Sequence, residues 1–136
     1  MLLPRLALCI VTGLILGLAP AAFAHHSNAA YDIDHLTTIG GTVKQVNWTN
    51  PHITFVVEKD AKGGEQPSIW VFEVSSPGVL NRSGWTKRSL QPGDHAVFHY
   101  APLRDGTSGG FLREVTLPNG KTLTYSFTPA DQAADK

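Results

Sequence analysis

Adjacent histidines, His25 and His26, are the residues of this chain whose types and position best suit metal chemistry. They directly follow Ala22-Phe23-Ala24, which has the small-residue pattern of a signal-peptidase site. Cleavage after Ala24 would make His25 the first residue of the mature protein. Its α-amine and imidazole could then chelate one metal ion, because an α-amine with an ordinary pKa of about 7.7–8.0 loses its proton readily to a metal.

His52 is the histidine that could complete such a site. It follows Asn50-Pro51 at the start of an expected strand, and proline restricts both its own backbone and that of the residue before it. The amine and Nδ1 of His25, with one imidazole nitrogen of His52, would form the T-shaped array called a histidine brace. These ligands suit Cu(II), and imidazole also suits Zn(II) and Ni(II). The simpler interpretation is a turn with His52 capping a strand edge.

The other four histidines are weaker candidates for this site. His26 ranks next, because a terminus with two histidines can bind Cu(II) without help from the fold. His35 is expected to be solvated in a polar arm. His95 and His99 stand four residues apart on one expected strand, which separates their side chains by about 13 Å. We therefore do not expect these two to share one ion.

The amino-acid composition further limits the possible metal ligands and binding partners. The only cysteine and the only methionine, Cys9 and Met1, both precede the expected cleavage point. Disulfides and sulfur ligands are therefore excluded from the mature domain, and any metal must use nitrogen and oxygen. Lys and Arg number 11 against 11 Asp and Glu, with no basic stripe, so neither nucleic-acid binding nor anionic-membrane binding is expected.

The motifs of common enzymes are also missing from the sequence. It has no nucleophile elbow, no phosphate-binding loop and no dinucleotide fingerprint. Glu73 is expected to point outward from a strand, where a solvated side chain is favoured over a metal ligand. Trp48, Trp70 and Trp85 are expected in the core or at the rim of the domain. We therefore expect no enzyme, although a copper oxidoreductase stays open as an alternative.

The first 24 residues have the three parts of a secretory signal. Arg5 supplies the positive charge, an apolar run covers residues 6–18, and small residues lead to Ala24. The apolar run is shorter than the roughly 20 residues that a transmembrane helix needs. The sequence therefore predicts export to the periplasm, with no stable membrane insertion after cleavage.

The mature chain is expected to form one small β domain. Short alternating runs predict strands, Ser75-Ser76-Pro77 predicts a capped helical turn, and Asn119-Gly120 predicts a hairpin. Three strands, one short helix and two or three more strands favour an OB-like, partly open β-barrel; another small barrel or a sandwich are the alternatives. The expected segments are a signal peptide over residues 1–24, an N-terminal arm over 25–37, the β domain over 38–127 and a flexible tail over 128–136.

Several short motifs occur together in this chain. They are His25-His26-Ser27, Tyr31-Asp32, Gly41-Thr42-Val43, Thr49-Asn50-Pro51-His52, Trp70 with Glu73, Gly84-Trp85, Leu90 with Pro92-Gly93-Asp94, and Asp105-Gly106. In this pattern the chain resembles a family of short exported bacterial proteins of unknown function, over nearly all of residues 25–125. The resemblance implies an exported small β domain with no established activity.

Two functional interpretations follow. In the first, the domain binds a divalent metal, Cu(II) before others, through His25 and His52 with His26 next in line, and serves in metal carriage, buffering or delivery. In the second, it is a metal-free periplasmic module that holds a peptide, a glycan or an envelope protein on the barrel face. The two differ in whether His25 and His52 can approach one ion.

Overall fold

The computed structural model describes residues 30–125. The expected cleavage site, His25, His26 and the expected tail lie outside these residues. The elements follow the predicted order of three strands, a short helix and three further strands. They are β1 (Thr37–Asn47), β2 (Ile53–Lys59), β3 (Ser68–Val74), α2 (Pro77–Arg82), β4 (His95–Pro102), β5 (Gly109–Thr116) and β6 (Thr122–Thr124).

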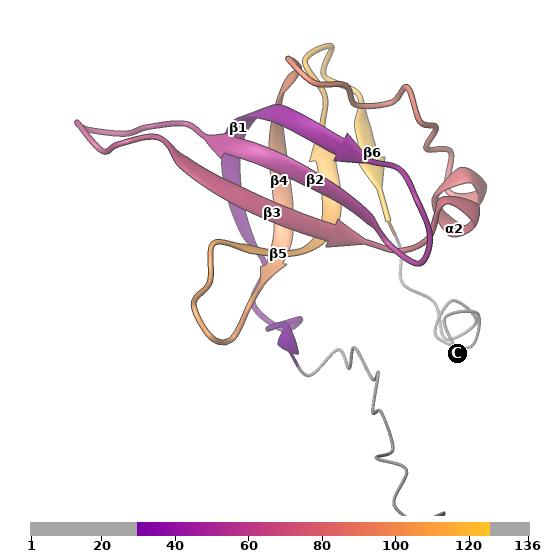
Figure 1. Cartoon of the computed structure of the whole chain (residues 1–136), viewed down its shortest axis with the longest axis horizontal. Helices are drawn as coiled ribbons and strands as arrows, with labels where there is room; N and C mark the ends of the chain where they lie inside the picture. Colours follow the sequence, from indigo (N-terminus) through magenta and orange to yellow (C-terminus); the bar gives the residue numbers. More distant parts are fainter. Residues whose placement is uncertain (1–29, 126–136) are drawn as a thin grey trace, which may run out of the picture.

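The strands form a β-barrel of OB-like topology, as predicted, and the barrel is closed (Figure 1). β1 is shared between two neighbours, because its first half pairs with β4 and its second half with β2. β4 continues to β5, and β2 continues to β3, in antiparallel register. A short parallel contact between β3 and β5 then closes the ring. β6 extends β5 as the hairpin that Asn119-Gly120 predicts.

Two glycines of β5 allow this closure. A Cβ at Gly109 would lie 2.2 Å from the carbonyl oxygen of Val71 on β3, and a Cβ at Gly110 would lie 2.2 Å from that of Ala101 on β4. Real side chains cannot approach a carbonyl this closely, so only glycine lets the three backbones meet here. We call this β3–β5 junction the seam.

The core is built by alternation along the strands, which places every second side chain inside. Phe55, Phe72 and Phe98 are fully buried, while Ile69 and Val71 on the outer face of β3 are about half exposed. Of the three tryptophans, Trp85 is buried, and Trp48 and Trp70 pack against the core while partly exposed. This burial follows the alternation from which the strands were predicted, and it places Glu73 on the outer face, as expected.

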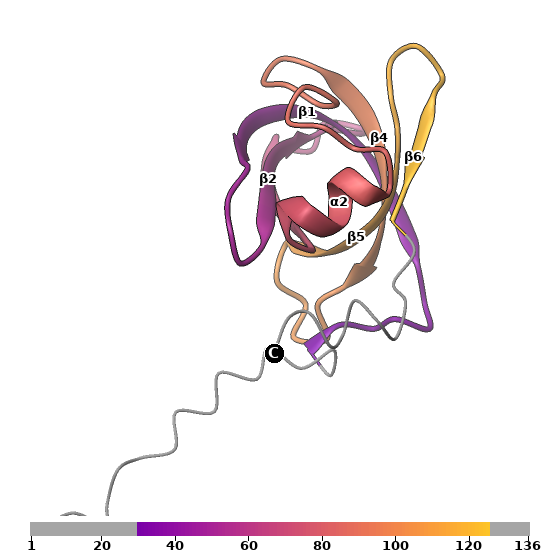
Figure 2. The same ribbon diagram turned by 90° about the vertical axis from the view of Figure 1, so that its right-hand side faces the viewer.

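The short helix covers one end of the barrel (Figure 2). Val79 and Leu80 are its buried residues, and Pro77 occupies the first turn as predicted. The expected side-chain cap is wrong: Ser76 is the N-cap residue, but its hydroxyl makes no capping hydrogen bond. The backbone carbonyl of Ser76 accepts the first helical bond from the amide of Leu80, and proline with the buried face defines this helix start.

The chain that precedes β1 is paired with the rest of the domain. Tyr31 forms an isolated antiparallel bridge with Leu103, just after β4. The amide of Asp32 donates to the carbonyl of Pro102 at 2.8 Å, and the amide of Arg104 donates to the carbonyl of Ala30 at 2.9 Å. Residues 30–32 therefore lie along the start of the β4–β5 loop. Within residues 30–125, no helix has the length and apolar character needed to cross a membrane.

Candidate functional site

His52 lies in the turn before β2, beside the outer face of β3. The Asn50-Pro51 peptide bond that precedes it is cis. Its Nδ1 pairs with Oε1 of Glu73, and the two side chains are only 20% and 26% exposed. The strand register explains the pairing, because Glu73 lies opposite Thr54 and Val74 lies opposite Ile53. His52 directly precedes Ile53, so it lies at the end of the β2–β3 pairing, close to Glu73.

The second carboxylate oxygen of Glu73 is held by Tyr31. The Tyr31 hydroxyl donates to Oε2 of Glu73 at 2.9 Å. The Tyr31 ring packs on Phe111, with ring centroids 5.5 Å apart, and Phe111 lies beside Glu73 in the parallel register of the seam. Burial, and then the negative charge of Glu73, raise the pKa of the Tyr31 hydroxyl, which keeps it protonated as a donor. We call Tyr31, His52 and Glu73 the seam cluster.

Glu73 is the residue whose surroundings the sequence did not predict. Alternation correctly places it on the outer face of β3, because its neighbours Phe72 and Val74 are both buried. It is not simply solvated, however, since a strand turn and the chain before β1 both reach its carboxylate. The motifs Tyr31-Asp32 and Trp70 with Glu73 contain both residues, but nothing in their spacing linked Tyr31 to Glu73.

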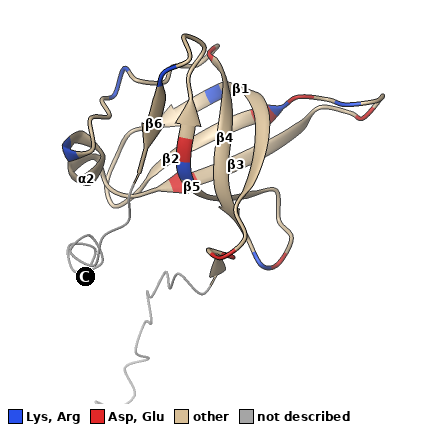
Figure 3. Cartoon of the chain, turned by 180° about the vertical axis from the view of Figure 1, so that it is seen from behind, with Lys and Arg blue, Asp and Glu red and all other residues tan. Residues whose placement is uncertain are grey.

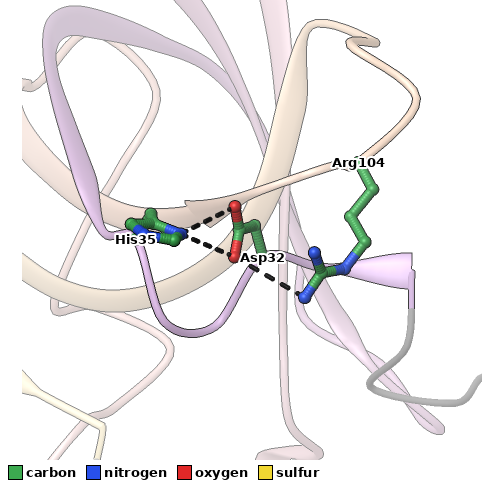
Figure 4. Close-up of polar contacts among 3 residues, drawn as sticks. All are labelled: Asp32, His35 and Arg104. Carbon is green, nitrogen blue, oxygen red and sulfur yellow. Dashed lines mark hydrogen bonds and ion pairs between the residues drawn. The ribbon is translucent and has the colours of Figure 1, made fainter.

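The segment just before β1, beside the cluster, makes a second group of polar contacts. Asp32 accepts from His35, with Nδ1 at 3.1 Å from each carboxylate oxygen, and it faces Nη2 of Arg104 at 3.5 Å (Figure 4). Arg104 belongs to the β4–β5 loop, so this group ties both sides of the backbone pairing at Tyr31. His35 is exposed, as expected, although it has a carboxylate partner.

With this geometry established, comparison with known proteins identifies the family. A family model described as "Family of unknown function (DUF6152)" matches residues 13–113, which is most of the chain. The chain belongs to the DUF6152 family. No curated protein matches it. The matched region of this DUF6152 chain contains all three residues of the seam cluster, together with His25 and His26.

The other described histidines of the DUF6152 domain also have carboxylate partners, but at the surface. His95 Nε2 lies 2.8 Å from Oδ2 of Asp60, and these side chains are 56% and 45% exposed. His99 Nε2 lies 3.7 Å from Oε1 of Glu114. His95 and His99 therefore have separate partners. Acidic and basic residues are mixed along β5 and around the β2–β3 loop on the side drawn in Figure 3.

The seam cluster supplies at most part of a metal site. Among residues 30–125, no three His, Cys, Asp or Glu side chains are grouped so as to hold an ion. His52 and Glu73 could contribute one nitrogen and one carboxylate, and further ligands would have to come from elsewhere. His25 and His26 lie outside the described residues. Close by, the hydroxyl of Ser75 is buried with no hydrogen-bond partner among the described residues.

Proposed function

We propose that this protein is exported to the periplasm and binds a divalent metal ion, with Cu(II) as the first candidate. Cleavage after Ala24 would expose His25, which would supply its α-amine and imidazole, and His52 would supply the third nitrogen. His26 is the next ligand in line. The observation that supports this proposal is the pairing of His52 Nδ1 with the Glu73 carboxylate.

The pairing matters because metal-binding histidines almost always donate their second ring N–H to a carboxylate, a carbonyl or water. Such a bond fixes the ring orientation and the tautomer, and it makes the other nitrogen a stronger ligand. With Nδ1 beside Glu73, a metal at His52 would be bound through Nε2. The His52–Glu73 pair is also the least exposed of the four described histidine–carboxylate pairs.

Chain length supports the participation of the N-terminus. Tyr31 follows His25 by six residues, and its hydroxyl donates to the Glu73 carboxylate that also pairs with His52. Six residues span at most about 20 Å when fully extended, a reach that would let His25 approach the seam cluster. Residues 25–136 contain no cysteine or methionine, and nitrogen and oxygen ligands favour Cu(II) over Cu(I). The proposed role is metal carriage, buffering or delivery, not catalysis.

The test combines N-terminal mass spectrometry with Cu(II) titration of the exported protein. We expect a mature start at His25, one tight Cu(II) site, and loss of that site in both His25→Ala and His52→Ala. His95→Ala is the matched control, because His95 also pairs with a carboxylate but lies on β4. A different mature start, or unchanged affinity in His25→Ala, would contradict the brace.

A metal-free binding module is the second candidate, and an exposed apolar strip favours it. Ile69 and Val71 are about half exposed on the outer face of β3, and Val56 lies opposite Val71 on β2. OB-like barrels commonly bind extended ligands over this pair of strands. Binding to peptide or glycan arrays that Val71→Lys abolishes and His52→Ala leaves intact would favour the module over the metal site.

A further inference from the structure

We propose that Glu73 and Tyr31 are positioning residues for the metal site, a role that rests on the function proposed above. In this arrangement Tyr31 holds Glu73, and Glu73 holds the His52 imidazole. The carboxylate thereby ties the metal-binding ring to the part of the chain that leads to the N-terminus. Neither residue is proposed to touch the metal.

The first support is that both oxygens of one carboxylate are engaged from different parts of the fold. Oε1 faces His52, from the turn before β2, and Oε2 accepts from the Tyr31 hydroxyl at 2.9 Å. Glu73 itself lies on β3, between β2 and β5. A carboxylate held at both oxygens has little rotational freedom, so the ring that pairs with it is held in one orientation.

The second support is that Tyr31 is fixed independently of its hydroxyl. Its flanking backbone bonds to the β4–β5 loop through Asp32 and Ala30, and its ring packs on Phe111. Removing the hydroxyl in Tyr31→Phe should therefore leave this part of the chain docked. That substitution separates the hydrogen bond to Glu73 from the packing that places the residue.

The third support is the contrast with the other histidine–carboxylate pairs. Asp60 and His95 are both about half exposed, and the His99–Glu114 contact of 3.7 Å is longer than a hydrogen bond. Exposed side chains of this kind reorient at little cost. Only at the seam, among the described pairs, does a partly buried tyrosine hold the carboxylate of the pair.

The magnitude expected for such residues is known in general. Loss of a group that orients a metal-binding histidine typically weakens metal affinity by about 10- to 100-fold. Glu73→Gln should fall in this range, because the amide is uncharged and pairs less strongly with the ring. Tyr31→Phe acts one step further away, and we expect a loss of about 10-fold or less.

The experiment uses the mature full-length protein, with its start confirmed by mass spectrometry. Cu(II) affinity is measured by competition with a chromophoric chelator for the wild type, Glu73→Gln, Tyr31→Phe and the control Asp60→Asn. Electron paramagnetic resonance of each Cu(II) complex, and ¹⁵N NMR of the metal-free His52 ring, report its geometry and tautomer. Thermal unfolding of each variant checks that the barrel is intact.

We expect the affinity order wild type, Tyr31→Phe, Glu73→Gln, with Asp60→Asn equal to the wild type. The His52 ring should change tautomer population in Glu73→Gln and not in Asp60→Asn. Tight wild-type binding with unchanged affinity in both seam variants would overturn the positioning role and leave the proposed function standing. Absence of Cu(II) binding by the wild type would overturn the proposed function, and the positioning role with it.

Discussion

The seam and the outer face of β4 use the same chemical pair in two different surroundings. At the seam, His52 and Glu73 are mostly buried, and the Tyr31 hydroxyl donates to the same carboxylate. On β4, His95 and its partner Asp60 are about half exposed. Exposed ion pairs contribute about 0–1 kcal/mol, because solvent screens them and their side chains are mobile. The comparison teaches that burial, more than the pair itself, distinguishes a candidate site.

The largest expected effect comes from disrupting the seam backbone. In Gly110→Val the new side chain would meet the carbonyl of Ala101 and the ring of Tyr100. We expect a loss of about 3 kcal/mol in the free energy of unfolding, at the upper end for overpacking. Urea denaturation measures it. Gly78→Ala is the control, since its nearest neighbour is the end of the Arg82 side chain at 3.8 Å; equal losses in both variants would contradict this account.

A smaller effect is expected from neutralising each carboxylate in turn. Glu73→Gln should lower the free energy of unfolding by about 1–2 kcal/mol, because hydrogen bonds to a charged group are lost in a partly buried place. Asp60→Asn should change it by less than about 0.5 kcal/mol. Chemical denaturation at neutral pH gives both values. If the two substitutions cost the same, the distinction between the seam and the β4 face is lost.

The smallest expected effect is a change in alkaline stability. Folding raises the pKa of Tyr31 above its ordinary value of 10, through burial and then the charge of Glu73. The folded protein therefore keeps a proton that the unfolded chain releases, so this stabilisation is complete below pH 10 and declines as the pH rises above 10.

Tyr31→Phe isolates that contribution. Tyr100 also has a raised pKa, because of burial, and it stays in the variant. We expect stability to decline less steeply above pH 10 in Tyr31→Phe than in the wild type, with only a modest difference because Tyr31 is half-buried. Denaturation midpoints between pH 9 and 11.5 measure this, and parallel curves would show that Tyr31 does not contribute.

Local pattern was enough to predict the strands, the helix position and the OB-like order. The alternation that predicted strands over residues 53–57 and 70–74 is the alternation that their burial follows, because strand geometry fixes which side chains share a face. The seam cluster could not be predicted in this way. Its three residues are brought together by the β2–β3 register, by the β3–β5 closure at Gly109 and Gly110, and by the return of the chain before β1. These are long-range contacts that no local spacing encodes.

The two ends of the described chain meet on one aromatic ring. Tyr31 and Tyr125 both pack on Phe111, with centroid distances of 5.5 and 5.9 Å. The polypeptide thus enters and leaves the barrel at nearly the same place, while the exposed β2–β3 loop extends from the opposite side (Figure 1). The described domain is therefore suited to circular permutation, with a linker that joins residues 30 and 125 and new ends opened between residues 61 and 66.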